Sequence, residues 1–143
     1  MKFFSIFVSA VIILSNGFAW AERLTVKASV ANIRSGPETS YEILWNAEKF
    51  YPIVVIEKTG PWYHFRDFEG DEGWIHKSLV GKFSAVITTK PKCNIRAGPG
   101  TDFEILFSVE SGVPFKVLKR KGNWIFIQHS DGDKGWIHKS LTW

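Results

Sequence analysis

The chain has 143 residues, a formal net charge of +4, and 45% hydrophobic residues. Its single cysteine cannot form an intramolecular disulfide, which excludes a disulfide-stapled scaffold, so the fold must be stabilised by packing. Seven Trp, twelve Phe and three Tyr residues suit that demand, because each buried aromatic ring removes about 150–250 Å² from water.

The N-terminus has the order of a secretory signal peptide. Lys2 precedes an apolar stretch from Phe3 to Leu14, and the small-residue pattern Ala19-Trp20-Ala21 follows. The apolar stretch is shorter than the roughly 20 residues that a membrane-spanning helix needs. We therefore predict a signal peptide over residues 1–21 that is cleaved after Ala21. The mature chain is then periplasmic or secreted, with no stable membrane insertion.

Residues 22–80 form the first of two predicted units. Their segments are short, rich in Val, Ile, Phe, Trp and Thr, and separated by Gly, Pro, Asp and Asn, which is typical of strands and turns. The expected strands cover residues 24–30, 42–46, 50–58, 62–68 and 72–76. A turn at Glu69-Gly70-Asp71 should join the last two strands as a hairpin, and Ser35-Gly36-Pro37 punctuates a longer early loop.

A linker at residues 81–85 leads to the second unit, residues 86–143. A shift of 62 residues superposes the halves without insertion, with 23 identities in 57 positions between 24–80 and 86–142. The linker spans at most about 18 Å when extended, which keeps the units adjacent. Five short strands bury little as a flat sheet. We therefore predict an all-β fold of two tandem small barrels with five to six strands each.

Three motifs occur in both units in the same order. They are Asn-Ile-Arg-Ser/Ala-Gly-Pro at 32–37 and 94–99, Gly-x-Trp at 60–62 and 122–124, and Gly-Trp-Ile-His-Lys-Ser-Leu at 73–79 and 135–141. Together they resemble the signature of bacterial SH3 (SH3b) domains, over nearly all of the mature chain. The resemblance implies SH3-like barrels that serve as targeting or binding modules in the cell envelope, often attached to enzymes that cut peptidoglycan. It does not fix a ligand.

The central aromatic strand of each unit divides by alternation into two faces. One face, assigned to the core, carries Tyr63, Phe65, Ile125 and Ile127. The opposite face carries the candidate ligand-binding residues Trp62, His64, Trp124 and Phe126. Aromatic side chains on a wet outer face need a reason. Three reasons stay open: a ligand platform, packing between the two units, and cover by a loop.

Further binding candidates follow the Gly-Pro loops, where the SH3-like resemblance implies one wall of a peptide groove. They are Tyr41, Trp45, Phe103 and Phe107, although core packing explains their shared aromatic character equally well. Arg34 and Arg96 occupy matching loop positions. Each could bind a peptide carboxylate in a forked geometry or brace its own loop by donating to backbone carbonyls.

The two halves differ in charge. Residues 22–80 carry 7 basic and 9 acidic residues, giving −2, whereas residues 81–143 carry 10 basic and 5 acidic residues, giving +5. The densest basic patch comprises Lys116, Lys119, Arg120 and Lys121. It is a candidate site for an anionic partner or simply a solvated face. Nucleic acid is not an expected partner of an exported protein.

The sequence gives catalysis no positive support. Cys93 has Ala31 as its repeat counterpart, which indicates a small apolar core position rather than a nucleophile beside a histidine. His76 and His138 are equivalent but have no second ligand at metal spacing, and His64 and His129 are not equivalent to each other. We expect no catalytic residue, no metal site and no cofactor.

Two functions remain as hypotheses. The first is a non-catalytic, monomeric binding protein whose tandem modules engage peptidoglycan or an extended peptide in the envelope, with avidity from two weak sites. The second is a structural or adaptor protein that docks onto another envelope protein through its outer aromatic face.

Overall fold

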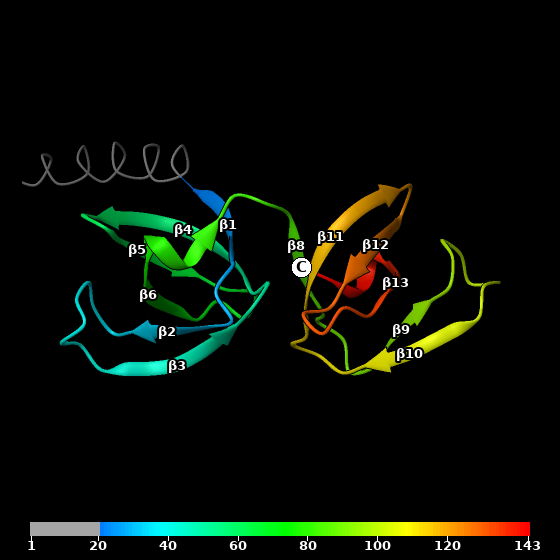
Figure 1. Ribbon diagram of the computed structural model, residues 1–143, viewed down its shortest axis with the longest axis horizontal. Coiled ribbons are helices and arrows are strands. Elements are labelled where there is room, and N and C mark those ends of the chain that lie inside the picture. The colour runs from blue at the N-terminus through cyan, green and yellow to red at the C-terminus, as the bar shows by residue number, and fades with distance from the viewer. Residues whose placement is uncertain (1–20) are drawn as a thin grey trace, which may run out of the picture.

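The computed structural model describes residues 21–143, which form two β-sheet units lying side by side (Figure 1). The predicted signal peptide covers residues 1–21, of which all but Ala21 lie outside the described residues. In the described part, no helix is long and apolar enough to cross a membrane.

The first unit is a seven-stranded antiparallel sheet. Its strands are β1 (Glu22–Val26), β2 (Val30–Arg34), β3 (Ile43–Glu48), β4 (Pro52–Thr59), β5 (Trp62–Arg66), β6 (Glu72–His76) and β7 (Val80–Gly81), with a 3₁₀ turn, η1 (Lys77–Leu79), after β6. Their order across the sheet is β3-β2-β6-β5-β4-β1-β7.

The second unit repeats this arrangement with six strands. They are β8 (Ala85–Ile87), β9 (Cys93–Arg96), β10 (Ile105–Val109), β11 (Pro114–Lys121), β12 (Trp124–Gln128) and β13 (Lys134–His138), with η2 (Lys139–Leu141) after β13. The sheet order β10-β9-β13-β12-β11-β8 matches the first unit without its last strand. The prediction of an all-β fold with two tandem small β domains is confirmed.

The start of the first unit differs from its prediction. One strand was expected over residues 24–30, but β1 ends at Val26 and a second strand, β2, begins at Val30. Two bends at Ala28 and Ser29 separate them. Neither Gly nor Pro stands between Val26 and Val30, so strand propensity alone does not reveal the break. The expected hairpin between β5 and β6 is present, with Trp62 paired to His76 and Arg66 to Glu72.

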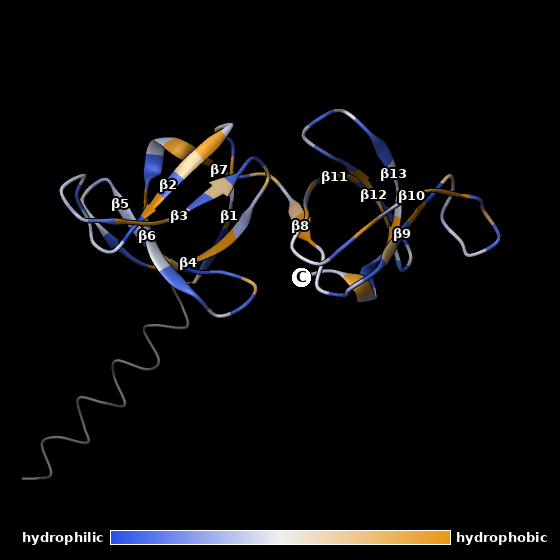
Figure 2. Ribbon diagram, turned by 90° about the horizontal axis from the view of Figure 1, so that it is seen from below, coloured by the Kyte–Doolittle hydropathy of each residue, from blue (hydrophilic) through white to orange (hydrophobic). Residues whose placement is uncertain are grey.

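Each unit has its own hydrophobic core. Phe65 is fully buried in the first unit, as are Ile125 and Ile127 in the second, and Tyr63 packs at the edge of the first core, as alternation predicts. Figure 2 shows the apolar residues concentrated on the strands and the hydrophilic ones on the connecting loops. Two separate cores predict that each unit folds largely on its own contacts.

The connection between the units is fixed by hydrogen bonds. The Thr25 hydroxyl donates to the carbonyl oxygen of Phe83 at 2.7 Å, and Arg23 donates from Nη2 to the carbonyl oxygen of Ala85 at 3.1 Å. The Arg23 guanidinium also lies 4.2 Å from the ring centre of Trp143, near the C-terminus between the units (Figure 1). β1 therefore holds the linker and the C-terminal residue together.

Candidate functional site

The first unit contains an open pocket of about 280 Å³ beside Trp62. We call it the first pocket; its lining residues come from β2, the loop after it, the start of β5, and the β6–η1 junction: Val30, Asn32, Arg34, Thr39, Trp62, His76, Ser78 and Leu79. These lining residues lie far apart in the sequence and come together because β6 pairs with both β2 and β5.

The second unit contains an equivalent pocket of about 230 Å³ beside Trp124. This second pocket is lined by Lys92, Asn94, Arg96, Thr101, Trp124, His138, Ser140 and Leu141. Every lining residue lies 62 positions after its counterpart in the first pocket, and seven of the eight pairs are identical. The duplication has therefore produced two copies of one pocket.

The tryptophan that anchors each pocket packs edge-on against the pocket histidine. Ring centres lie 5.2 Å apart for Trp62 and His76, and 5.1 Å apart for Trp124 and His138. Trp62 is only 9% exposed, so the outward face predicted for it is largely covered by its neighbours. Neither pocket draws a lining residue from the other unit, so packing between the units does not explain these tryptophans.

The pocket asparagines are held by hydrogen bonds to their side-chain oxygens. Asn46 donates to Oδ1 of Asn32 at 2.6 Å, and the hydroxyl of Ser108 donates to Oδ1 of Asn94 at 2.8 Å. Because each Oδ1 is engaged as an acceptor, the Nδ2 amide group remains as a donor at the pocket.

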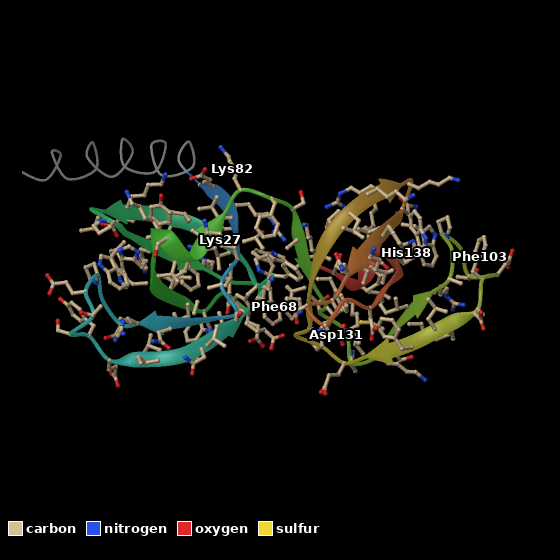
Figure 3. All side chains as sticks on the ribbon, viewed as in Figure 1. Lys27, Phe68, Lys82, Phe103, Asp131 and His138 are labelled. Atoms are coloured by element: carbon tan, nitrogen blue, oxygen red, sulfur yellow. The ribbon has the colours of Figure 1, made fainter. Side chains whose placement is uncertain are left out.

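The pocket histidines have the same tautomer in both units. Nδ1 of His76 accepts from the backbone N–H of Ser78 at 3.2 Å, and Nδ1 of His138 accepts from Ser140 at the same distance. A neutral imidazole whose Nδ1 accepts carries its proton on Nε2. Each ring therefore keeps one N–H donor, and the same bond caps the 3₁₀ turn that follows. Figure 3 shows His138 within the second unit.

Each pocket arginine braces its own loop. Nη1 of Arg34 donates to the carbonyl oxygens of Thr39 and Tyr41, both at 3.0 Å. Arg96 does the same with Thr101 and Phe103. A guanidinium has five N–H donors, so these bonds orient the group and leave donors for a ligand. Arginine, asparagine and histidine together make each pocket rich in donors beside an aromatic ring.

An outer aromatic pair lies beside each pocket. His64 stacks on Trp74 with ring centres 4.8 Å apart, and Phe126 lies against Trp136 at 5.1 Å. In register, Trp74 is opposite the pocket residue Arg34, and Trp136 is opposite Arg96. His64 and Phe126 are therefore each separated from a pocket arginine by one tryptophan across the sheet. Neither of them lines a pocket.

The surroundings of the two aromatic pairs differ in charge. His64 lies between two carboxylates, 3.4 Å from Glu57 and 3.0 Å from Glu72. In the second unit, Nζ of Lys119 lies 5.4 Å from the ring centre of Phe126 and 5.7 Å from that of Trp136. Acidic groups thus surround the first pair, and a cation lies over the second.

The four aromatic residues after the Gly-Pro loops lie outside the pockets. Trp45 packs edge-on against Phe65 in the first core, with ring centres 6.2 Å apart, and Phe107 packs against the second core. Tyr41 and Phe103 are exposed. Each covers a loop glycine, since a Cβ at Gly36 or Gly98 would overlap the Tyr41 or Phe103 ring. Figure 3 shows Phe103 at the outer end of the second unit.

An exposed apolar strip continues from these two rings onto the terminal strands β3 and β10. The strip has the same members in both units, each 45–48% exposed: Tyr41, Ile43 and Leu44 in the first, and Phe103, Ile105 and Leu106 in the second. Because β3 and β10 end their sheets, this surface combines apolar side chains with a strand edge.

The four basic residues predicted as a patch lie on β11 and have different neighbours. Lys116 lies 5.7 Å from the ring centre of Phe83, and Lys119 covers the second aromatic pair. Arg120 instead lines an open hollow of about 240 Å³ at the junction of the units, with Arg23 and Lys82. Burial and the charge of Arg120 lower the pKa of Arg23. Lys121 is exposed, and its backbone pairs with Trp124.

Cys93 and its counterpart Ala31 are both fully buried, as expected of a small apolar core position. The Cys93 thiol donates to the carbonyl oxygen of Lys90 at 3.5 Å, and burial raises its pKa. A protonated thiol in the core is a poor nucleophile.

The carboxylate of Asp67 is buried and fully engaged within its loop. It accepts from the Tyr51 hydroxyl at 2.5 Å and from the backbone N–H groups of Glu69 and Asp71 at 3.0 and 2.9 Å. The Asp67 carboxylate and the backbone of Glu69 and Asp71 therefore form a braced turn.

Several pocket residues were missed by reasoning from the sequence. They are Asn32 and Asn94, Thr39 and Thr101, His76 and His138, Ser78 and Ser140, Leu79 and Leu141, and the differing pair Val30 and Lys92. The usable signal was identity between the copies at polar positions such as Asn32, Thr39 and Ser78, which core packing does not require.

Comparisons with known proteins agree with the duplication. A family model described as bacterial SH3 domain matches residues 27–82 and 89–143. A Bacillus subtilis protein named putative N-acetylmuramoyl-L-alanine amidase YrvJ is 27% identical over 117 residues, which cover 74% of this chain and 22% of that protein. Probable cell wall amidase LytH of Staphylococcus epidermidis is 36% identical over 61 residues, covering 42% of this chain and 21% of the relative.

The chain thus spans about a fifth of the length of these curated relatives. Among solved structures, an NlpC/P60 family protein from Bacillus cereus matches with a TM-score of 0.42 and 14% identity, over 85% of this chain and 56% of that one.

Proposed function

The chain belongs to the bacterial SH3 domain family, and from this premise we propose that it is a non-catalytic binding protein that engages peptidoglycan through its two pockets. The observation that carries the proposal is the repetition of one donor-rich aromatic pocket, with seven of eight lining residues identical.

The donors in each pocket fit a ligand rich in carbonyl and carboxylate oxygens. The asparagine amide, the histidine Nε2–H and the free guanidinium donors all seek acceptors. The tryptophan ring adds rigid apolar contact area at low entropic cost. Peptide stems and N-acetylated sugars present such oxygens along a repetitive polymer, so two pockets on one chain gain avidity.

The names of the relatives favour the same ligand. The curated matches are named as amidases of the cell wall or of N-acetylmuramoyl-L-alanine, and the matched segments are short parts of those proteins. We infer that these parts are binding modules and that this chain works in the cell envelope as an exported monomer.

A binding role without catalysis accounts for the reactive groups. Cys93 is a buried, protonated thiol. His76 and His138 are engaged at Nδ1 as caps of 3₁₀ turns. These groups serve the fold and the pocket walls, and a nucleophile paired with a base is not needed to explain any of them.

The proposal is tested by filling the pockets without removing any packing. Thr39 and Thr101 are exposed and contribute their carbonyl oxygens to the arginine brackets, so Thr39→Trp with Thr101→Trp adds bulk and keeps those bonds. We expect the double variant to lose co-sedimentation with purified sacculi at about 0.15 M salt, where surface attraction is screened.

Ser130→Trp is the matched control, because it adds the same side chain in the exposed β12–β13 turn, at the other end of β12 from Trp124. It should co-sediment like the wild type. Unchanged co-sedimentation of the double variant would reject peptidoglycan binding at these pockets.

A second candidate function, docking onto another envelope protein, is favoured by the exposed apolar strip. Main-chain pairing along β3 or β10 would extend a sheet. Ile43→Lys with Ile105→Lys should then abolish cross-linking to a single protein in envelope extract, while the pocket variants leave it intact. The opposite dependence would assign that cross-linking to the pockets.

A further inference from the structure

The two pockets differ at one lining position. Val30 lines the first pocket and is 61% exposed, whereas Lys92 occupies the equivalent place in the second. The other seven positions are identical, so any difference in ligand preference arises from this pair and from the charges next to the lining.

Those neighbouring charges reverse in the same direction. The register places Glu57, His64, Trp74 and Arg34 in one row across the first sheet, and Lys119, Phe126, Trp136 and Arg96 in the second. One further pair, Glu72 and Lys134, also changes sign. Residues opposite each other on adjacent strands lie about 5 Å apart, so the three steps of each row place Glu57 and Lys119 about 15 Å from the pocket arginines, outside the pocket lining.

Three of four equivalent positions carry most of the charge difference between the halves, and the fourth is arginine in both. Val30, Arg34, Glu57 and Glu72 sum to −1, whereas Lys92, Arg96, Lys119 and Lys134 sum to +4. These positions therefore account for five of the seven charge units that separate the halves. Each early loop also contributes one exposed acidic residue, Glu38 or Asp102, which leaves the difference unchanged.

We infer that the pockets share a shape but differ in their preference for a charged ligand. The second pocket, with Lys92 in its lining, takes a carboxylate-bearing segment of an extended peptide, and the first, with Val30 at that place, takes an uncharged segment. This inference rests on the proposed binding at these pockets. A ligand with both kinds of segment would lie along the chain in one direction only.

Local pairing does not cancel the difference. Glu57 and Glu72 share one histidine, His64, so two carboxylates face a single imidazole. Lys92 and Lys134 are exposed, and within the described residues neither is part of a salt bridge. Only Lys92 of this pair lines the second pocket, which therefore keeps one unneutralised lysine where a carboxylate would enter.

The test uses three short probes with the mature chain. They are N-acetyl-tetraalanine with a free carboxylate, its carboxamide, and tetraalanine carboxamide with a free amine. The indole N–H signals of Trp62 and Trp124, assigned with Trp→Phe variants, report each pocket separately by NMR. We expect the carboxylate probe to bind the second pocket about two- to fivefold more tightly than the carboxamide, which is the range for one exposed charge contact.

Two reciprocal substitutions isolate the lining difference. Lys92→Val should remove the carboxylate preference at Trp124, and Val30→Lys should create one at Trp62. Both positions are exposed, so neither change disturbs a core. The amine probe should bind at Trp124 more weakly than the N-acetylated carboxamide, because Lys92 and Arg96 repel a second cation.

The inference is overturned if the Trp124 signal of the wild type shows no preference for the carboxylate probe, or does not respond to any probe. It is also overturned if Lys92→Val keeps the carboxylate preference of the wild type. The sacculus assay separates this failure from failure of the proposed function. If the variant with Thr39→Trp and Thr101→Trp loses co-sedimentation with sacculi while the Trp124 signal shows no carboxylate preference, only the charge inference is rejected.

Discussion

At the scale of single residues, Tyr51 and Asp67 show how one buried hydrogen bond links stability to pH. Burial, the hydrogen bond to Asp67 and nearby carboxylates raise the pKa of the Tyr51 hydroxyl well above its ordinary value. The folded state therefore holds a proton that the unfolded state releases above about pH 10. This contribution to stability is complete below that pH and is lost as the pH rises through it.

We predict that Tyr51→Phe lowers the free energy of unfolding of the first unit by about 1.5–3 kcal/mol at neutral pH, because a hydrogen bond to a charged group is lost. Between about pH 9 and 11, the wild type should lose stability faster than the variant. Denaturant unfolding followed by tryptophan fluorescence measures both. Parallel pH profiles would show that Tyr51 is not the titrating group.

The hydrogen bond between Tyr51 and Asp67 could not be predicted from the sequence. The second unit has Val113 and His129 where the first has Tyr51 and Asp67, so comparing the copies gave no signal for this bond. By contrast, Arg34 and Arg96 match, and their bracing of the loop was among the two roles predicted for them. Their second role, at the pocket, stays a prediction.

At the scale of elements, a glycine lets β6 pack closely against β2 in the first unit, and another lets β13 pack closely against β9 in the second. A Cβ at Gly73 would overlap Cγ2 of Ile33, and one at Gly135 would overlap Cγ2 of Ile95. Gly135 also faces the carbonyl oxygen of Arg96 at 3.1 Å from the same Cβ position. Alanine fits neither site unless the strands shift.

We predict that Gly73→Ala lowers the stability of the first unit by about 1–3 kcal/mol, the usual cost of overpacking. Gly135→Ala should do the same to the second unit and cost more, because a backbone carbonyl yields less than a side chain. In each case the other unit should keep its unfolding midpoint, since the cores are separate. Two variants that each shift both transitions equally would contradict this independence.

Strand type and alternation were predictable at this scale, but the pocket was not. The burial of Phe65, Ile125 and Ile127 follows from period-2 alternation. The pocket instead joins β2, the start of β5 and the β6–η1 junction, which lie far apart in the sequence. Which residues meet there depends on sheet order. Because the break between β1 and β2 was not predicted, β2 was not recognised as a separate strand.

At the scale of the whole molecule, duplication supplies two pockets of one shape on a chain whose linker is held from β1. A fixed linker limits how the pockets can move relative to each other, which raises the effective concentration of the second pocket once the first is occupied. The pocket linings differ in charge only at Val30 and Lys92, and we propose that the tandem works as one site with two unlike ends.

The most direct test of this account is the equilibrium binding of residues 22–143 to sacculi, with Thr39→Trp and Thr101→Trp measured singly and together. If both pockets engage one polymer, each single variant should weaken binding by about tenfold or more, and the double variant should bind no better than background. Single variants that bind as tightly as the wild type would contradict the joint action of the two pockets.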